Sequence, residues 1–248
     1  MNEEMRQSRE FYQEYFSEAS DLTYDNQQRY EILHSLVDEI PLDSTASVID
    51  IGSGSGRNTT FLSTRFEDVM AIDITEPPLM EETIEKTDAS FAEAALPYLP
   101  FKSGTFDLVV CSEVIEHIPE RSLQLAAIEE ITRLLTSGGW LVISTPNPNS
   151  PYSRIMNFIL NFAEFTGAYE SADGQLVENW IPPQELKNAI LNDLQIKEAR
   201  GSYYSLPGFN TGLERTLRPI SDAITERNLA PNFGLYQYYI ARNDPPES

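Results

Sequence analysis

A run of alternating glycines directly after a short apolar segment constrains this chain most. Ser47–Ile51 has the composition of a buried parallel strand, and it leads into Asp50-Ile51-Gly52-Ser53-Gly54-Ser55-Gly56, after which residues 58–65 are typical of a helix. Glycine adopts positive φ and lets a ligand approach the backbone closely, and a helix start presents N–H groups at its positive dipole end. The sequence therefore predicts a strand, a ligand-binding loop and a helix.

Three ligand classes compete for this loop, beside the alternative of a tight turn without a ligand. A P-loop would need a Gly-Lys-Ser/Thr ending, and Arg57-Asn58-Thr59 stands there instead. A dinucleotide site prefers G-x-G-x-x-G, whereas these glycines run G-x-G-x-G. The third ligand is a nucleoside that carries a carboxylate, which the loop N–H groups would hold while Asp50 holds an ammonium group. Asp73, at the end of the next predicted strand, would accept hydrogen bonds from both ribose hydroxyls.

Short apolar segments alternate with helical ones along most of the chain. Strands are predicted at residues 47–51, 69–73, 89–92, 106–111, 140–144, 195–200 and 235–241. Helices are predicted at residues 58–65, 78–87, 123–135, 154–165 and 182–191, and Ser137-Gly138-Gly139 would close the third of them with a left-handed cap. This alternation predicts an α/β fold, a doubly wound Rossmann-like sheet of seven mostly parallel strands.

The chain divides into two predicted parts. Residues 1–40 are expected to form an N-terminal helical segment that stops before Pro41, and residues 41–248 a single domain. Within this domain, residues from about 147 to 180 form a substrate-side insertion. Its apolar helix at 154–165 is expected to act as a lid, with a lipid-contacting surface as the alternative.

Charge and cysteine content exclude several kinds of protein. The 248 residues include 17 basic and 39 acidic side chains, and the net charge of −22 disfavours a nucleic-acid partner. Cys111 is the only cysteine, which excludes a disulfide framework. No stretch of about 20 apolar residues and no leader is visible, so we expect a cytoplasmic protein with at most peripheral contact at the inner membrane face. Abundant carboxylates with few lysines suggest a salt-loving source.

Four motifs occur in a familiar order. They are Val48–Gly56, Asp73, the segment Phe91–Pro97 with Phe106-Asp107 behind it, and Ser137–Ile143. In this order they resemble the class I S-adenosylmethionine-dependent methyltransferase family, which implies S-adenosylmethionine as the cofactor. The resemblance implies that Gly52, Gly54 and Gly56 line the methionine part and that Asp73 binds the ribose. It also implies that Glu93, where the family usually has aspartate, accepts from the adenine amino group beside the Ala94 N–H.

The segment after the fourth predicted strand holds the candidate catalytic residues. A sulfonium already activates its methyl group, so a hydroxyl acceptor mainly needs alignment and a base. His117 is the predicted base, with Glu116 beside it; a histidine that only packs at the site wall is the alternative. Glu113, Glu116 and His117 would share a helix face and resemble a Mg²⁺- or Zn²⁺-binding string of some O-methyltransferases. Because no fourth ligand is visible, we predict no metal.

The acceptor is predicted mainly from resemblance. Ser144–Pro148 resembles family members that methylate sugars, and we predict O-methylation of a sugar, such as a hexuronic acid of a surface N-glycan in a halophilic archaeon. The partner would be a small molecule, a sugar or a lipid-linked glycan. Arginines and tyrosines of the later half could meet it: Arg154, Arg200, Arg215, Arg218, Tyr203 and Tyr204. The alternatives are a quinone precursor or other phenol, an NAD-dependent oxidoreductase, and a non-catalytic cofactor-binding subunit.

Overall fold

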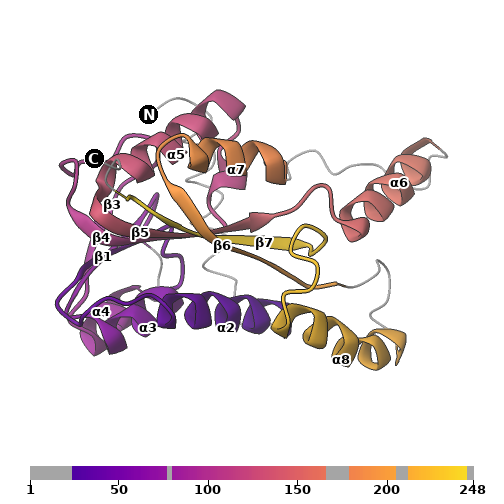
Figure 1. Ribbon diagram of the computed structural model, residues 1–248, viewed down its shortest axis with the longest axis horizontal. Helices are drawn as coiled ribbons and strands as arrows, with labels where there is room; N and C mark the ends of the chain where they lie inside the picture. Colours follow the sequence, from indigo (N-terminus) through magenta and orange to yellow (C-terminus); the bar gives the residue numbers. More distant parts are fainter. Residues whose placement is uncertain (1–23, 77–79, 166–178, 205–211, 245–248) are drawn as a thin grey trace.

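The computed structural model describes residues 24–76, 80–165, 179–204 and 212–244, which build a seven-stranded sheet with helices on both faces (Figure 1). The strand order is β3-β2-β1-β4-β5-β7-β6, and β7 alone runs in the opposite direction to the other strands of the sheet. The strands are β1 (Ser47–Ile51), β2 (Asp68–Asp73), β3 (Ser90–Glu93), β4 (Phe106–Ser112), β5 (Leu135–Pro146), β6 (Gln195–Ser202) and β7 (Tyr236–Arg242). The predicted Rossmann-like sheet of seven mostly parallel strands is confirmed.

Helices cover the two sheet faces as separate layers (Figure 1). One face carries α2 (Tyr24–Asp38), α3 (Arg57–Arg65), α4 (Met80–Lys86) and α8 (Gly212–Glu226). The other carries α5 (Arg121–Leu134) and α7 (Pro183–Leu191), while α6 (Pro151–Phe165) follows β5 and projects away from the sheet. Side chains alternate along β1, so that Val48 packs with the first layer and Ile49 with the second.

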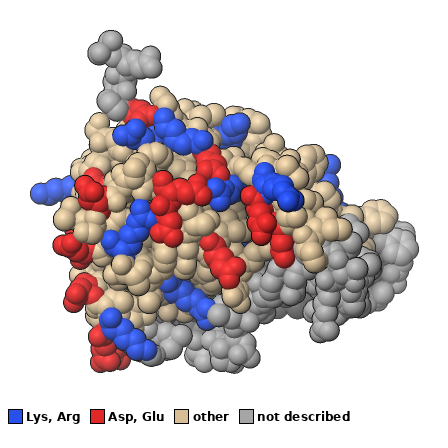
Figure 2. All heavy atoms as spheres, turned by 60° about the horizontal axis from the view of Figure 1, so that its bottom comes forward, with Lys and Arg blue, Asp and Glu red and all other residues tan. Residues whose placement is uncertain are grey.

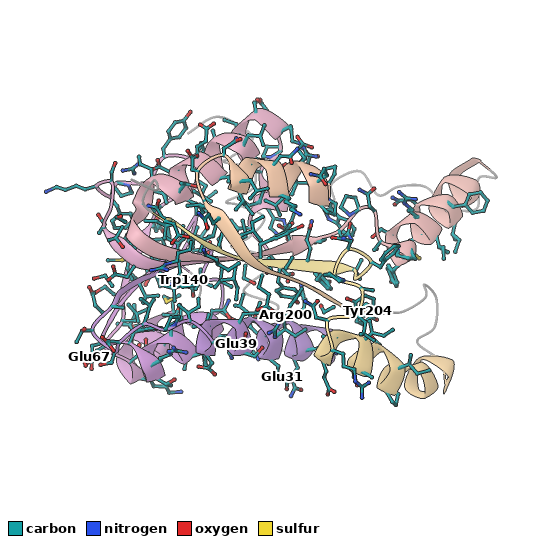
Figure 3. All side chains as sticks on the ribbon, in the orientation of Figure 1. Glu31, Glu39, Glu67, Trp140, Arg200 and Tyr204 are labelled. Carbon is teal, nitrogen blue, oxygen red and sulfur yellow. The ribbon has the colours of Figure 1, made fainter. Side chains whose placement is uncertain are left out.

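Helix α2 belongs to the layered core. Its residues Leu33, Leu36 and Val37 are buried in the same apolar cluster as Val48 of β1 and Leu62 of α3. Polar contacts fix its end, because Arg200 of β6 forms an ion pair with Glu39 just beyond α2 (2.8 Å; Figure 3). Arg200 is therefore engaged in an ion pair at this position, and its contact with an acidic acceptor stays a prediction.

The junction between α5 and β5 differs from the prediction. The helix ends at Leu134, and Leu135 already has extended backbone angles and lies opposite Phe106 of β4. Gly138 has the predicted positive φ (84°), but it lies inside β5, where its N–H donates to the Asn243 carbonyl (2.6 Å). The predicted glycine cap is wrong, because pairing with β4 begins at Leu135, before the glycines are reached.

Helix α8 was not predicted. It contains Pro219, a residue that normally interrupts a helical pattern.

In the described part of the chain, no helix combines the length and apolar character needed to cross a bilayer. Figure 2 turns the lower helices of Figure 1 toward the reader, and on the described part of this face basic and acidic side chains are interspersed.

Candidate functional site

The strand order itself places a crevice at the carboxyl end of the sheet. Strands follow outward from β1 to β2 and β3 in one direction, and from β4 to β5 in the other. Ligands of open α/β sheets bind outside the carboxyl ends of the strands at such a switch point. The two segments that leave this point are the glycine loop after β1 and residues 113–117 after β4.

The glycine loop requires glycine for two separate reasons. Gly52, Gly54 and Gly56 have φ angles of 72°, 50° and 80°, in the left-handed region that favours glycine. In addition, a Cβ on Gly52 would lie 2.2 Å from Cγ2 of Val114, and one on Gly56 would lie 2.4 Å from Oγ1 of Thr83. The first contact joins the two segments of the crevice, since Val114 belongs to the segment after β4.

We expect Gly52→Ala to destabilise the fold by about 2–3 kcal/mol, because it adds both overpacking and backbone strain. For a chain of this size that corresponds to a fall in Tm of roughly 5–10 °C. Gly104→Ala is the matched control, since Gly104 also has positive φ (64°) but its nearest contact would be 3.9 Å away. Thermal unfolding of both variants measures the difference; equal losses would contradict a special close approach at Gly52.

Most N–H groups of the loop donate inside the protein. Those of Gly52 and Ser53 donate to the Ile72 carbonyl (2.8 and 3.0 Å), that of Gly54 to Oδ2 of Asp73 (2.8 Å) and that of Gly56 to Ser53. These N–H groups are therefore engaged within the protein, and their donation to a ligand carboxylate stays a prediction. In the loop region the N–H groups of Ser55, Arg57 and Asn58 remain as donors, since that of Thr59 faces Asp50 and that of Thr60 donates to the Gly56 carbonyl (2.8 Å).

Two buried carboxyl groups lie beside this loop. Asp50 is fully buried in β1, and its Oδ2 accepts a hydrogen bond from Oγ1 of Thr59 in α3 (2.7 Å). Burial, and to a smaller extent the charge of Asp73, raise the pKa of Asp50 to about 7. Burial also raises the pKa of Asp73, whose Oδ2 accepts from Gly54. Two neighbouring carboxyl groups favour a ligand that carries positive charge.

Unpartnered polar atoms test whether the cofactor fits here. Oδ1 of Asp50, Oγ of Ser53 and Oγ1 of Thr75 are buried and make no hydrogen bond. Buried polar groups are normally paired, so a cluster of exceptions indicates a ligand or water in the functional state. Asp50 and Ser53 lie at the carboxyl end of β1, and Thr75 follows β2. S-adenosylmethionine would place its ammonium group and ribose at these strand ends. The residues present fit that cofactor.

The predicted adenine contacts lie at the end of β3. Glu93 is opposite Asp73 in the parallel register, so the two carboxylates end neighbouring strands. The Ala94 N–H donates to the Asp73 carbonyl (2.9 Å) and is thus engaged within the protein. Contact of Glu93 and Ala94 with adenine stays a prediction.

The segment after β4 does not form the predicted helical face. Glu113 has a positive φ (57°) and forms an ion pair with Arg29 of α2, while η1 (Ile115–His117) is a single 3₁₀ turn. Glu116 is buried and accepts from Oγ1 of Thr145 (3.0 Å). Among the described residues, no group of three acidic, histidine or cysteine side chains could hold a metal ion. The expected shared face of Glu113, Glu116 and His117 is therefore wrong.

Arg29 is a crevice residue that sequence reasoning missed. Its guanidinium contacts the Glu113 carboxylate and lies 4.5 Å from the ring centroid of Tyr236, at the start of β7. A cation at this position could meet the cofactor carboxylate or an acidic acceptor. The packing of α2 brings Arg29 to the crevice, and no sequence motif around Arg29 predicts this position.

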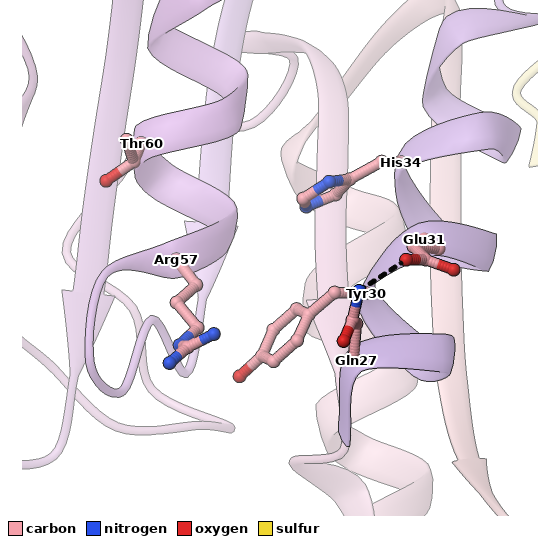
Figure 4. A pocket seen from close by; sticks show the side chains of 6 residues that line it. All are labelled: Gln27, Tyr30, Glu31, His34, Arg57 and Thr60. Atoms are coloured by element: carbon pink, nitrogen blue, oxygen red, sulfur yellow. Dashed lines mark hydrogen bonds between the residues drawn. The ribbon is translucent and has the colours of Figure 1, made fainter. Parts of the chain in front are cut away.

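A separate pocket of about 380 Å³ lies between α2 and α3 (Figure 4). It is lined by Gln27, Tyr30, Glu31, His34, Arg57 and Thr60. His34 stacks on Phe61 at 3.8 Å and contacts Oδ1 of Asn58 at 3.3 Å, and burial lowers its pKa. His34 thus packs against α3, and its burial disfavours the charged form.

The predicted acceptor side is only partly assembled. Tyr203 meets Tyr152 of α6 edge-on, with ring centroids 6.0 Å apart, whereas Tyr204 donates its hydroxyl to the Ala230 carbonyl (3.0 Å). Arg154 is exposed on α6, and the side chains of Arg215 and Arg218 lie outside the described residues. On α6, Ile155, Phe158 and Ile159 are exposed apolar residues.

Comparison with known proteins identifies the class. Residues 49–143 match the family model described as "Methyltransferase domain". A ubiquinone biosynthesis O-methyltransferase of Dechloromonas aromatica is 27% identical over 83% of this chain and 95% of its own length. The N-methyltransferase NodS of Bradyrhizobium japonicum, solved with S-adenosyl-L-homocysteine, has a TM-score of 0.60 at 15% identity and covers 97% of this chain and 100% of its own.

The chain resembles the class I S-adenosylmethionine-dependent methyltransferases, and residues 49–143 are its methyltransferase domain. It is an S-adenosylmethionine-dependent methyltransferase, which decides against an NAD-dependent oxidoreductase. The fold alone does not select a reaction: the [4+2]-cyclase SpnF shares it, with a TM-score of 0.60 at 15% identity over 92% of this chain and 85% of its own.

Proposed function

We propose that this methyltransferase acts on a hydroxyl of a phenolic, quinone-precursor-like small molecule. The supporting observation is the likeness to ubiquinone biosynthesis O-methyltransferases, one of which aligns along nearly its whole length. An imidazole at the carboxyl end of β4 fits this chemistry, since a hydroxyl needs a base before it can accept a methyl group. A phenol is well suited to a histidine base, because its pKa is about 10, far below that of an alcohol.

The bound cofactor would supply a methyl group already activated by its sulfonium. Asp50 and Asp73 would hold the cofactor's cationic and ribose groups, and the glycine loop would allow it close to the backbone. His117 would take the acceptor proton, and the layers around the crevice would keep water from the reacting groups. Most of the rate enhancement would come from alignment of acceptor and methyl group.

A sugar acceptor is the second candidate. The edge-on pair of Tyr152 and Tyr203, from α6 and the end of β6, supports it, because aromatic side chains often stack on sugar rings. The exposed apolar residues of α6 would suit a lipid-linked form of either acceptor at a membrane face.

Transfer of label from methyl-labelled S-adenosylmethionine into a cell extract tests the acceptor class. We expect label in a small aromatic molecule, stable to mild base as an aryl ether. Label in glycan would favour the sugar candidate, and base-labile label would indicate a methyl ester and contradict hydroxyl chemistry. A His117→Ala enzyme is the control for protein-dependent transfer, with little label expected.

A further inference from the structure

Glu116 lies next to His117, yet its own side chain is buried. Its Oε2 accepts a hydrogen bond from Oγ1 of Thr145 in β5 (3.0 Å), and its main-chain oxygen accepts from the Asn179 N–H (2.8 Å). Glu116 is thus held from two sides, by the sheet and by the segment that leads into α7. This geometry favours a role other than proton exchange with a substrate, for which a group must reach the reacting atom.

The residues that follow Glu116 are bonded to the same segment. The side chain of Asn179 donates to the Pro119 carbonyl (2.9 Å). The buried Nε2 of Gln124 donates to both the Ile118 and Asn179 carbonyls (2.9 and 2.6 Å). Glu116 and Pro119 are therefore bonded directly to Asn179, some sixty residues further along the chain, and Ile118 is linked to it through Gln124.

We propose that Glu116 is a positioning residue that, with Thr145 and Asn179, sets the orientation of the His117 imidazole at the crevice. This inference rests on the proposed function, in which His117 accepts the substrate proton. A short 3₁₀ turn has few internal hydrogen bonds, so outside contacts decide its geometry. Small errors in the placement of a catalytic group cost large factors in rate, which explains why a carboxylate would be kept buried for this purpose.

The chain has only two histidines, so selective ¹⁵N-histidine labelling gives a direct readout of His117 with His34 as an internal reference. We expect Thr145→Val, which removes the hydroxyl donor, to shift the His117 ring signals and leave those of His34 unchanged. Thr145→Ser should restore them, since it restores the donor. Thr136→Val is the matched control at the other end of β5, where the hydroxyl donates to Asp107 (2.8 Å), and it should move neither histidine.

Binding of S-adenosylhomocysteine, measured by calorimetry on the same samples, separates the two claims. We expect its affinity to be unchanged in Thr145→Val and in Glu116→Met, which removes the acceptor of the same hydrogen bond. If both variants leave the His117 signals in place, or Thr145→Ser fails to restore them, Glu116 has no positioning role. If the wild-type protein does not bind S-adenosylhomocysteine, the proposed function fails whatever the histidine signals show.

Discussion

Asp50→Asn should make the ligand-free protein more stable at pH 8 and at the same time weaken cofactor binding. The pKa of Asp50 is raised from 3.8 to about 7. As the pH rises, the Asp50 carboxyl group therefore loses its proton at a lower pH in the unfolded chain than in the folded protein. The free energy of unfolding consequently falls between about pH 4 and pH 7. A difference of about three pKa units corresponds to roughly 4 kcal/mol at full effect.

Asparagine keeps an oxygen that accepts from Thr59 and cannot ionise, so this pH-dependent loss should vanish. The variant should then melt roughly 10 °C above the wild type at pH 8, and close to it at pH 4. The same change removes the negative charge that we propose holds the cofactor's ammonium group, so affinity for S-adenosylhomocysteine should fall about tenfold or more. Such a trade of binding for stability is common where a site holds a strained or desolvated group.

Thermal unfolding from pH 4 to 8, with calorimetry at pH 8, checks both halves of this prediction. Asp68→Asn is the matched control, because Asp68 is an exposed carboxylate at the opposite end of the neighbouring strand β2. It should change neither the pH profile nor the affinity. Equal melting temperatures of Asp50→Asn and wild type at pH 8, with equal affinity, would show that Asp50 is not a desolvated ligand group.

Asp73→Ala should lower the affinity for S-adenosylhomocysteine by about one to two orders of magnitude. A hydrogen bond to a charged group is worth roughly 1.5–3 kcal/mol, and we propose that Asp73 accepts hydrogen bonds from the ribose. In the wild-type protein the Gly54 N–H donates to Oδ2 of Asp73 (2.8 Å). The substitution removes this hydrogen bond, so the glycine loop loses part of its support. Both effects act in the same direction on binding.

The control for this second prediction is Asp68→Ala, which removes a carboxylate from the amino end of β2 without touching the crevice. Circular dichroism should show that Asp73→Ala is folded, and calorimetry then gives the change in affinity. An affinity equal to that of the wild type in a folded Asp73→Ala protein would remove Asp73 from the binding site.

The parts of the structure that could be predicted are those with local causes. Apolar runs such as Ser47–Ile51 and Phe106–Cys111 have no solvent-facing side, which is typical of buried parallel strands, and the structure confirms them. The three loop glycines predict positive φ angles, because few other residues adopt them, and the structure has these angles. Asp50 and Asp73 could be placed together because parallel strands end at one edge of the sheet.

Features set by contacts distant in sequence could not be predicted. Leu135 joins β5 because it pairs with Phe106, although the residues around it have a helical pattern. Glu113 leaves the expected helical face because it adopts positive φ and meets Arg29, a residue of α2. The carboxylate of Glu116 has the chemistry of a catalytic acid, but it is buried and bonded to Thr145. This contact forms only once β4 and β5 are paired.

Titration of the wild-type protein with S-adenosylhomocysteine by calorimetry is the most direct test of the account. A crevice built by Gly52–Gly56, Asp50 and Asp73 should bind one molecule per chain with a dissociation constant in the micromolar range. This corresponds to a binding free energy of about −8 kcal/mol. NADH under the same conditions should give no heat of binding. A folded protein that takes up NADH, or that takes up no S-adenosylhomocysteine at millimolar concentration, would contradict it.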